Sequence, residues 1–436
     1  MHKCPGRLLQ PTFNLLGKGV RAMLDTVFIG IDVSSQTNVV HVMDQAGNRI
    51  WADSFLNSRR GSEQMVSRLT ADAALQDAFY CFGLEATGCY GKGLEMFLRE
   101  TPLIPAKRKA VHVLNPKQVK RFHDAYADLQ KDDYIDAFVI ANSLRFGRLA
   151  IKEAAVEDKY LALQRVTRWR YQTAQELTRE KNRYLQNLFL KFSAMAQLQG
   201  SQDALFSNTF GATALDFIED FEDVDQIAYT HVEDLIQYLI DHGKNHFADP
   251  QQLAQDIQKA ARTSYRLPKA VSDSVNQVLA MQINTIRFYE QQLKEIDKVI
   301  ERQVQAIPNT LTSIPGIGPV YAAGLLAEIG DVKRFESEAA LAKFAGLTWT
   351  KHQSGTFQQE NTHLIQGGNR FLRYYFCQAA NLVRQHDPDY RKYYLSKYRE
   401  TAKSPHKRAL VLTARKLVRL VFVLLRDGTL YKLQTR

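Results

Sequence analysis

The sequence predicts a multidomain protein with an α/β domain first, long helices next and a mostly helical domain last. Three observations support this division. Short β-branched runs occur within the first 150 residues, a heptad-like apolar pattern lies near the middle, and Gly and Pro interrupt helical patterns towards the end. The length of 436 residues suits two or three domains, and 45% hydrophobic with 24% charged residues is typical of globular cores.

The first domain is predicted to contain a mixed sheet. Strands are predicted at residues 27–33, 39–43, 50–55, 79–84 and 111–114. Helices are predicted at residues 62–70, 94–99 and 133–144. Turn residues join the first three strands into an antiparallel meander, and helices then alternate with strands, which is the pattern of an RNase H-like layer. We assign it residues 24–150 and treat residues 1–23, which are basic and contain no acids, as an N-terminal arm, with Met23 as an alternative start.

The middle region, residues 151–306, is predicted to be a helical coiled-coil linker with an acidic insertion at about 200–260. Its seam steps alternately by four and three through Val275, Leu279, Gln282, Ile286, Tyr289, Leu293, Ile296 and Ile300. Such a seam indicates a coiled coil, within one chain or between subunits, and predicts self-association in the second case. A long helix packed on its own domain is the alternative. Between residues 201 and 250 eleven acids accompany one base, so this insertion would repel a phosphate backbone.

The last domain, residues 307–436, ends in a basic segment. The chain carries a formal net charge of +11. Residues 391–436 contain thirteen Lys and Arg and two acids, so this segment accounts for the whole excess. A concentrated basic region is typical of nucleic-acid binding, and a solvated tail is the alternative. The candidate nucleic-acid-binding residues here are Lys407, Arg408, Arg415 and Lys416.

Cysteine usage and hydropathy exclude several other classes of protein. None of the four cysteines stands at CxxC spacing, so neither a zinc site nor a disulfide framework is indicated. This usage fits a reducing cytoplasm. No apolar run approaches the roughly 20 residues that a membrane span needs, so we expect no membrane partner.

Four acids in the first domain suit a metal site. Asp32 lies inside the first strand, where a carboxylate is costly unless it is paired or binds a cation. Glu85 directly follows the fourth strand, and Asp133 and Asp136 share one face of a predicted helix. Hard oxygen ligands suit Mg²⁺ or Mn²⁺, and two such ions can hold both reacting oxygens of a phosphodiester. The alternative is that the helix acids only favour a helix N-terminus and that Asp32 is a turn or pairing residue.

A glycine-rich turn precedes a helix of small residues in the last domain. It contains Gly316 and Gly318 within Ser313-Ile314-Pro315-Gly316-Ile317-Gly318-Pro319. This pattern is typical of a helix-hairpin-helix, in which backbone N–H groups at a helix start bind phosphate. A plain tight turn between packed helices is the alternative.

A serine in a polar loop is the candidate nucleophile. Ser354 precedes a glycine and follows Lys351, so its hydroxyl is expected to be accessible. Arg370 and Arg373 lie close by in sequence and could hold a phosphate. Most Ser-Gly pairs belong to ordinary loops, and that alternative stays open on the sequence alone.

These motifs, taken in order, resemble one family. They are Gly30-Ile31-Asp32-Val33-Ser34, Glu85-Ala86-Thr87-Gly88, Asn115-Pro116, Lys131-Asp132-Asp133-Tyr134-Ile135-Asp136-Ala137, Pro315-Gly316-Ile317-Gly318, Ser354-Gly355, Gly368-Asn369-Arg370-Phe371-Leu372-Arg373 and Ala414-Arg415-Lys416-Leu417. From Leu24 onward the chain resembles the bacterial DEDD-type insertion-sequence transposases of the IS110 family. It departs from the family's usual Lys-Thr-Asp at Lys131-Asp132-Asp133, which makes Asp132 an alternative metal ligand.

The resemblance implies a RuvC-like N-terminal domain, a coiled-coil linker and a C-terminal transposase domain. It implies that Asp32, Glu85, Asp133 and Asp136 bind divalent metal, and that Ser354 is a nucleophile forming a phosphoserine link with DNA. It also implies a structured noncoding RNA, the bridge RNA, that pairs with donor and target DNA. The expected assembly is a tetramer, a dimer of dimers whose active sites combine two subunits, at the nucleoid in the bacterial cytoplasm.

Two other functions are compatible with the same residues. A metal-dependent, structure-specific nuclease such as a junction resolvase would need the acids but not the Ser354 loop. A non-catalytic nucleic-acid-binding remnant of a transposase would need neither, and the four intact acids count against it.

Overall fold

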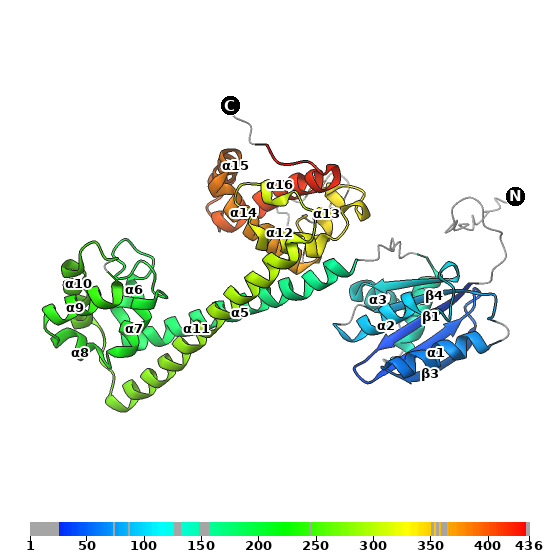
Figure 1. Ribbon diagram of the computed structural model, residues 1–436, viewed down its shortest axis with the longest axis horizontal. Helices are drawn as coiled ribbons and strands as arrows, with labels where there is room; N and C mark the ends of the chain where they lie inside the picture. The colour runs from blue at the N-terminus through cyan, green and yellow to red at the C-terminus, as the bar shows by residue number, and fades with distance from the viewer. Residues whose placement is uncertain are drawn as a thin grey trace. The chain divides into compact units, whose positions relative to one another are not determined.

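The computed structural model describes residues 26–72, 75–85, 88–125, 132–147, 157–244, 246–349, 353–354, 357–358, 364–365 and 367–432. The chain divides into two compact units, residues 1–155 and 156–436 (Figure 1). Within the parts of the chain described here, no helix combines the length and the apolar character needed to cross a membrane.

The first unit is built on a five-stranded sheet. Its strands are β1 (Thr26–Val33), β2 (Thr37–Met43), β3 (Arg49–Leu56), β4 (Phe79–Glu85) and β5 (Lys109–Leu114). The spatial order is β3-β2-β1-β4-β5, with β1 antiparallel to β2 and parallel to β4. The predicted meander, and the change to alternating helices and strands after it, are therefore confirmed.

Helices cover this sheet, and alternate residues of β1 face the helices on its two opposite sides. The helices are α1 (Arg59–Ala71), α2 (Tyr90–Glu100), η1 (Ala106–Arg108), α3 (Pro116–His123) and α4 (Asp133–Arg145). Ile29 and Ile31 belong to the core that also takes residues from α1 and α2. Gly30 lies on the opposite face, where a Cβ would stand 2.0 Å from the carbonyl oxygen of Ala137 in α4. Only glycine therefore allows α4 to lie this close to β1.

Two long helices, α5 (Asp158–Lys191) and α11 (Lys269–Gln305), lie side by side in the second unit (Figure 1). The pair is antiparallel, since Arg170 contacts Asp297 at 2.5 Å whereas Lys181 contacts Glu290 at 2.7 Å. The predicted seam on α11 is buried at Val275, Leu279, Gln282, Ile286 and Ile300. The partner of this seam is thus in the same chain.

The acidic insertion is a small helical body whose hydrophobic core is shared with residues of α5 and α11. Its helices are α6 (Ser193–Leu198), α7 (Ala212–Asp220), α8 (Val224–Tyr229), α9 (Val232–Gly243) and α10 (Pro250–Thr263). Lys191, at the end of α5, is buried and donates from Nζ to the carbonyl oxygen of Ile218 at 2.7 Å. Burial lowers the pKa of Lys191 to about 8.

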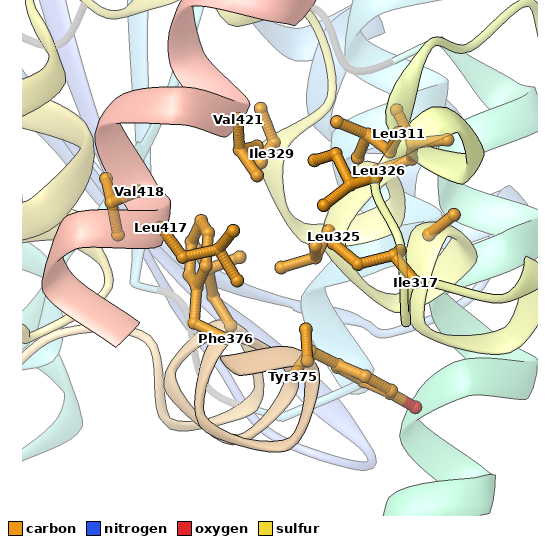
Figure 2. Packing of buried hydrophobic residues seen from close by; sticks show 14 of the residues in the cluster. Leu311, Ile317, Leu325, Leu326, Ile329, Tyr375, Phe376, Leu417, Val418 and Val421 are labelled. Atoms are coloured by element: carbon orange, nitrogen blue, oxygen red, sulfur yellow. The ribbon is translucent and has the colours of Figure 1, made fainter. Parts of the chain in front are cut away.

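The rest of the second unit is mostly helical. Its elements are η2 (Leu311–Ser313), α12 (Pro319–Ile329), η3 (Val332–Arg334), α13 (Glu338–Phe344), β6 (Gln353–Ser354), β7 (Phe357–Gln358), α14 (Arg370–His386), α15 (Pro388–Arg399) and α16 (Pro405–Asp427). Leu325 and Leu326 of α12 pack with Phe376 of α14 and Leu417 of α16 in one core (Figure 2). Tyr375 joins this core to α5, because its hydroxyl donates to the carbonyl oxygen of Thr167 at 2.6 Å.

Candidate functional site

Two of the predicted acids lie at the same edge of the sheet. Asp32 is the penultimate residue of β1 and Glu85 is the last residue of β4. These strands are parallel, and their pairing runs as far as Ile31 with Leu84, so the two acids follow at the next step. Gly30 and Gly83 both face α4, and alternation therefore places Asp32 and Glu85 on that same face.

Helix α4 brings the other two acids to this edge. Asp133 and Asp136 both lie in its first turn. Asp132 is the N-cap of α4, and its side chain accepts from the backbone N–H of Tyr134. Asp132 thus has a capping role, which accounts for a carboxylate at this position without a metal. The close contact of α4 with Gly30 fixes its first turn near Asp32.

Three other acids, Asp136, Asp133 and Glu85, act electrostatically on the Asp32 carboxyl. Burial, followed by the charges of Asp136, Asp133 and Glu85, raises the pKa of the Asp32 carboxyl to about 6. Negative charges that repel one another at a sheet edge are the arrangement that a divalent cation would neutralise. Among the described residues, however, no group of three or more His, Cys, Asp or Glu is arranged to hold a metal ion. The donors fit the metal chemically but do not converge on one point.

A histidine that the sequence did not single out lies beside these acids. The Nε2 atom of His123, at the end of α3, is 3.9 Å from Oδ1 of Asp136. This nitrogen is buried and has no hydrogen-bond partner among the residues that the structure describes. Nothing in the local sequence could have predicted the contact, because it depends on how α3 and α4 pack.

The glycine-rich turn has one packed glycine and one exposed glycine. Gly316 has a φ of +91°, and a Cβ there would lie 2.8 Å from the carbonyl carbon of Leu382 in α14. Gly318 is the N-cap of α12 and is exposed, with open space where its Cβ would be. The element before the turn is the single-turn 3₁₀ helix η2 rather than the α-helix of a helix-hairpin-helix. Close packing against α14 therefore explains Gly316, and only Gly318 presents an open helix start.

The predicted nucleophile belongs to a short hairpin. Ser354 in β6 pairs with Phe357 in β7. Towards the base of the same segment, Trp349 pairs with Leu364, and Ile365 donates its N–H to the carbonyl of Thr348 at 2.9 Å. The side chain of Ser354, and Lys351 altogether, lie outside the described residues.

The two arginines of α14 have different surroundings. Arg370 is exposed, with its guanidinium 4.8 Å from the ring centre of Phe371. Arg373 donates to the carbonyl oxygens of Ala345 and Gly367 at 3.2 and 2.5 Å. Arg370 is thus available to a phosphate, whereas Arg373 ties together the two ends of the segment that carries Ser354.

The predicted basic residues lie on α16. Lys407 and Arg408 are exposed in its first turn, and Arg408 is 3.2 Å from Glu400. Arg415 is half-buried. Lys416 is also half-buried, with Nζ 4.6 Å from the ring centre of Tyr390 and 4.9 Å from that of Tyr393. A surface of cations beside tyrosine rings suits nucleic acid, because it offers both charge and stacking faces.

Two family models match this chain, and each covers one of the candidate sites. The DEDD transposase model of IS110 matches residues 29–192, which include all four acids. The transposase model of the IS116/IS110/IS902 family matches residues 309–395, which include Ser354. The chain belongs to the IS110/IS116 family of transposases. As a transposase it is a DNA recombination enzyme, and a DEDD-type domain suggests dependence on a divalent metal.

Individual relatives agree with this assignment. The chain is 26% identical to an uncharacterized 43.6 kDa protein of insertion element IS110 from Streptomyces coelicolor, over 94% of this chain and 97% of that one. It is 24% identical to an uncharacterized 44.8 kDa protein of IS116 from Streptomyces clavuligerus, over 93% and 96%. It is also 27% identical to the pilin gene-inverting protein of Moraxella bovis, over 33% of this chain and 47% of that one.

Proposed function

We propose that this transposase cuts donor and target DNA and rejoins the ends, with an acidic metal site and Ser354 as the nucleophile. The observation that supports the acidic half is the combined effect of Asp136, Asp133 and Glu85 on the pKa of Asp32. The serine half rests on the resemblance of the Ser354 motif to the family's nucleophile, within the region that the second family model matches.

The acidic edge is proposed to hold the divalent cation, Mg²⁺ or Mn²⁺. Asp32, Glu85, Asp133 and Asp136 are the residues that would bind it. The chemistry supplied on binding is neutralisation of charge on the oxygens of the reacting phosphodiester. Glu85 ends its strand, and Asp133 and Asp136 lie in the first turn of their helix, so all of these acids belong to the ends of elements.

Ser354 is proposed to form a covalent link with DNA. Its Oγ attacks a DNA phosphorus, the P–O bond to a deoxyribose oxygen breaks, and the serine proton passes to that oxygen. A deoxyribose hydroxyl of the other DNA then attacks the phosphoserine ester and gives its proton back to Ser354. The two steps conserve the number of phosphodiester bonds, so no nucleotide cofactor is needed.

The partners follow from the charge and the family. Arg370, Lys407, Arg408, Arg415 and Lys416 are proposed to contact nucleic acid, and Lys351 and Gly318 are candidates beside them. A structured noncoding bridge RNA is proposed as the guide, so that base pairing and not side chains selects donor and target. A tetramer is the proposed assembly, with an interface other than the α11 seam, because that seam packs within the chain.

A metal-dependent nuclease is the second candidate. The observation that favours it is that all four acids belong to one compact unit, residues 1–155, whereas Ser354 belongs to the other. Such an enzyme would hydrolyse DNA and leave free ends, and the second unit would only bind nucleic acid.

One experiment separates these candidates. Purified protein is mixed with RNA transcribed from the flanks of its element, donor and target DNA, and Mg²⁺. Wild type is compared with Ser354→Ala and Asp32→Ala. Loss of recombinant product in both variants supports the recombinase. Cleavage that survives Ser354→Ala but not Asp32→Ala supports the nuclease instead.

A further inference from the structure

The segment that carries Ser354 closes on itself at two glycines. Gly346 and Gly368 have φ values of +70° and +90°, and a Cβ on Gly368 would lie 2.5 Å from the backbone nitrogen of Gly346. Asn369 donates its backbone N–H to the carbonyl of Phe344 at 2.6 Å. The two ends of the segment therefore meet at a tight base, which a side chain at either glycine would force apart.

A buried carboxylate holds one side of this base. The side chain of Glu328 in α12 is 0% exposed, and it accepts from Nδ2 of Asn369 at 2.7 Å. Oδ1 of the same asparagine accepts from the backbone N–H groups of Phe371 and Leu372, at 3.0 and 3.1 Å. Asn369 thus links Glu328 to the start of α14 and to the end of the serine segment.

Helix α5 completes the environment of Glu328. Arg168 donates to both carboxylate oxygens, at 2.7 and 2.9 Å, and Nε2 of Gln164 lies 3.2 Å from one of them. A buried ion pair of this kind is weak as a stabilising device, because an apolar group of similar volume serves the fold as well or better. The ion pair instead fixes positions, because the Glu328 carboxylate accepts from four donor groups and each hydrogen bond has a preferred direction.

Arg373 of α14 holds the same base through a second set of hydrogen bonds. Arg373 donates to the carbonyls of Ala345 and Gly367, one on each side of the closure. The base is consequently held at two points, by Glu328 through Asn369 and by Arg373.

We infer that Glu328 and Asn369 are positioning residues for the proposed nucleophile: they fix the base of segment 346–368 and so the place of Ser354. Ser354 is five residue steps beyond Trp349, which is at most about 17 Å of extended chain. A tilt of about 10° at the base would move the far end by at most about 3 Å, and a displacement of about 1 Å can slow a reaction about 100-fold. The inference rests on the proposed function of Ser354.

The test measures formation of the denaturant-stable protein–DNA adduct at saturating DNA, with full-length protein, RNA and Mg²⁺. Asn369→Ser keeps an oxygen that caps α14 but removes the bond to Glu328. We expect the rate of adduct formation to fall about 100-fold. The DNA concentration at half-saturation should change less than about two-fold, because no proposed DNA contact is altered. A loss that appeared only as weaker DNA binding would overturn the inference.

A polarity swap distinguishes positioning from general destabilisation. Asn369→Asp places two carboxylates together and should slow adduct formation at least as much as Asn369→Ser. Adding Glu328→Gln lets an amide face a carboxylate again, and the double variant should recover to within about ten-fold of wild type. Failure of the double variant to improve on Asn369→Asp would overturn the inference.

Two controls separate this inference from the proposed function. Asp249→Ala removes the N-cap of α10 in the helical insertion, so it should lower stability without changing the adduct rate. Ser354→Ala is run beside all variants. If it abolishes the adduct while Asn369→Ser keeps the wild-type rate, the inference alone fails. If Ser354→Ala still forms the adduct, the proposed function fails and the inference with it.

Discussion

The contact between Gly30 and α4 gives a sharp prediction about the acidic edge. In Gly30→Ala the new Cβ would lie 2.0 Å from the Ala137 carbonyl oxygen and 2.4 Å from the Ala141 nitrogen. Ordinary contact needs roughly 3.4 Å, so α4 must move away from β1 by about 1.4 Å. The first turn of α4 carries Asp133 and Asp136, and this movement takes both acids away from Asp32.

The movement should reduce both stability and metal response. Overpacking of this kind costs about 1–3 kcal/mol, which corresponds to a fall of about 4–12 °C in melting temperature for a domain of this size. The rise in melting temperature on adding Mg²⁺ should shrink as well, because a displaced ligand set binds the ion less tightly. Scanning calorimetry with EDTA and with Mg²⁺ measures both effects.

A glycine in the same domain provides the matched control. Gly93 lies in α2 with open space around its Cβ position, so Gly93→Ala should leave the Mg²⁺ response intact and stabilise the helix by about 0.5–1 kcal/mol. A Gly30→Ala protein with the wild-type melting temperature and the full rise in melting temperature on adding Mg²⁺ would refute the reasoning.

Three further predictions concern pH, salt and the C-terminal segment. Because the folded-state pKa of Asp32 is raised from 3.8 to about 6, its contribution to stability is complete below pH 3.8 and is lost as pH rises through 6. Asp32→Asn should therefore stabilise the metal-free protein by about 1 kcal/mol at pH 7.5, after allowance for solvent screening, but should not stabilise it at pH 4. Thermal melts at the two pH values measure this difference, and an equal gain in stability at both would contradict the prediction. Replacing Lys407 and Arg408 by Gln should flatten the slope of log affinity against log salt by about one to two, as measured by fluorescence anisotropy, and an unchanged slope would place the nucleic acid elsewhere. Tyr431→Phe removes the hydroxyl that donates to the buried Asp387. The free energy of unfolding measured in urea should therefore fall by about 1–3 kcal/mol. An unchanged urea midpoint would show that this hydrogen bond does not stabilise the fold.

Local patterns predicted the sheet and the positions of its acids. The apolar run around Asp32 and the runs before Glu85 and Leu114 each gave a strand, because buried strands leave a clear sequence pattern. The heptad seam on α11 was also predicted, but its partner was not. The sequence shows which face of a helix is apolar, whereas α5 within the chain or a second subunit could cover that face equally well.

The contacts that position the candidate groups could not be predicted in this way. His123 meets Asp136, and Glu328 meets Arg168 and Asn369, only through packing between elements far apart in the chain. Arg373 was expected to hold phosphate, yet its guanidinium binds two backbone carbonyls. A sequence pattern gives the chemical type of such a side chain but not the acceptor it finds in the folded protein.

The most direct test of the central proposal is to locate the covalent link. The protein–DNA adduct formed with RNA, donor and target DNA and Mg²⁺ is trapped in denaturant, digested with nuclease and protease, and analysed by mass spectrometry. The proposed mechanism predicts a nucleotide esterified to Ser354, absent from Ser354→Ala and strongly reduced in Asp32→Asn. Recombinant product without any adduct, or a nucleotide on another residue, would contradict it.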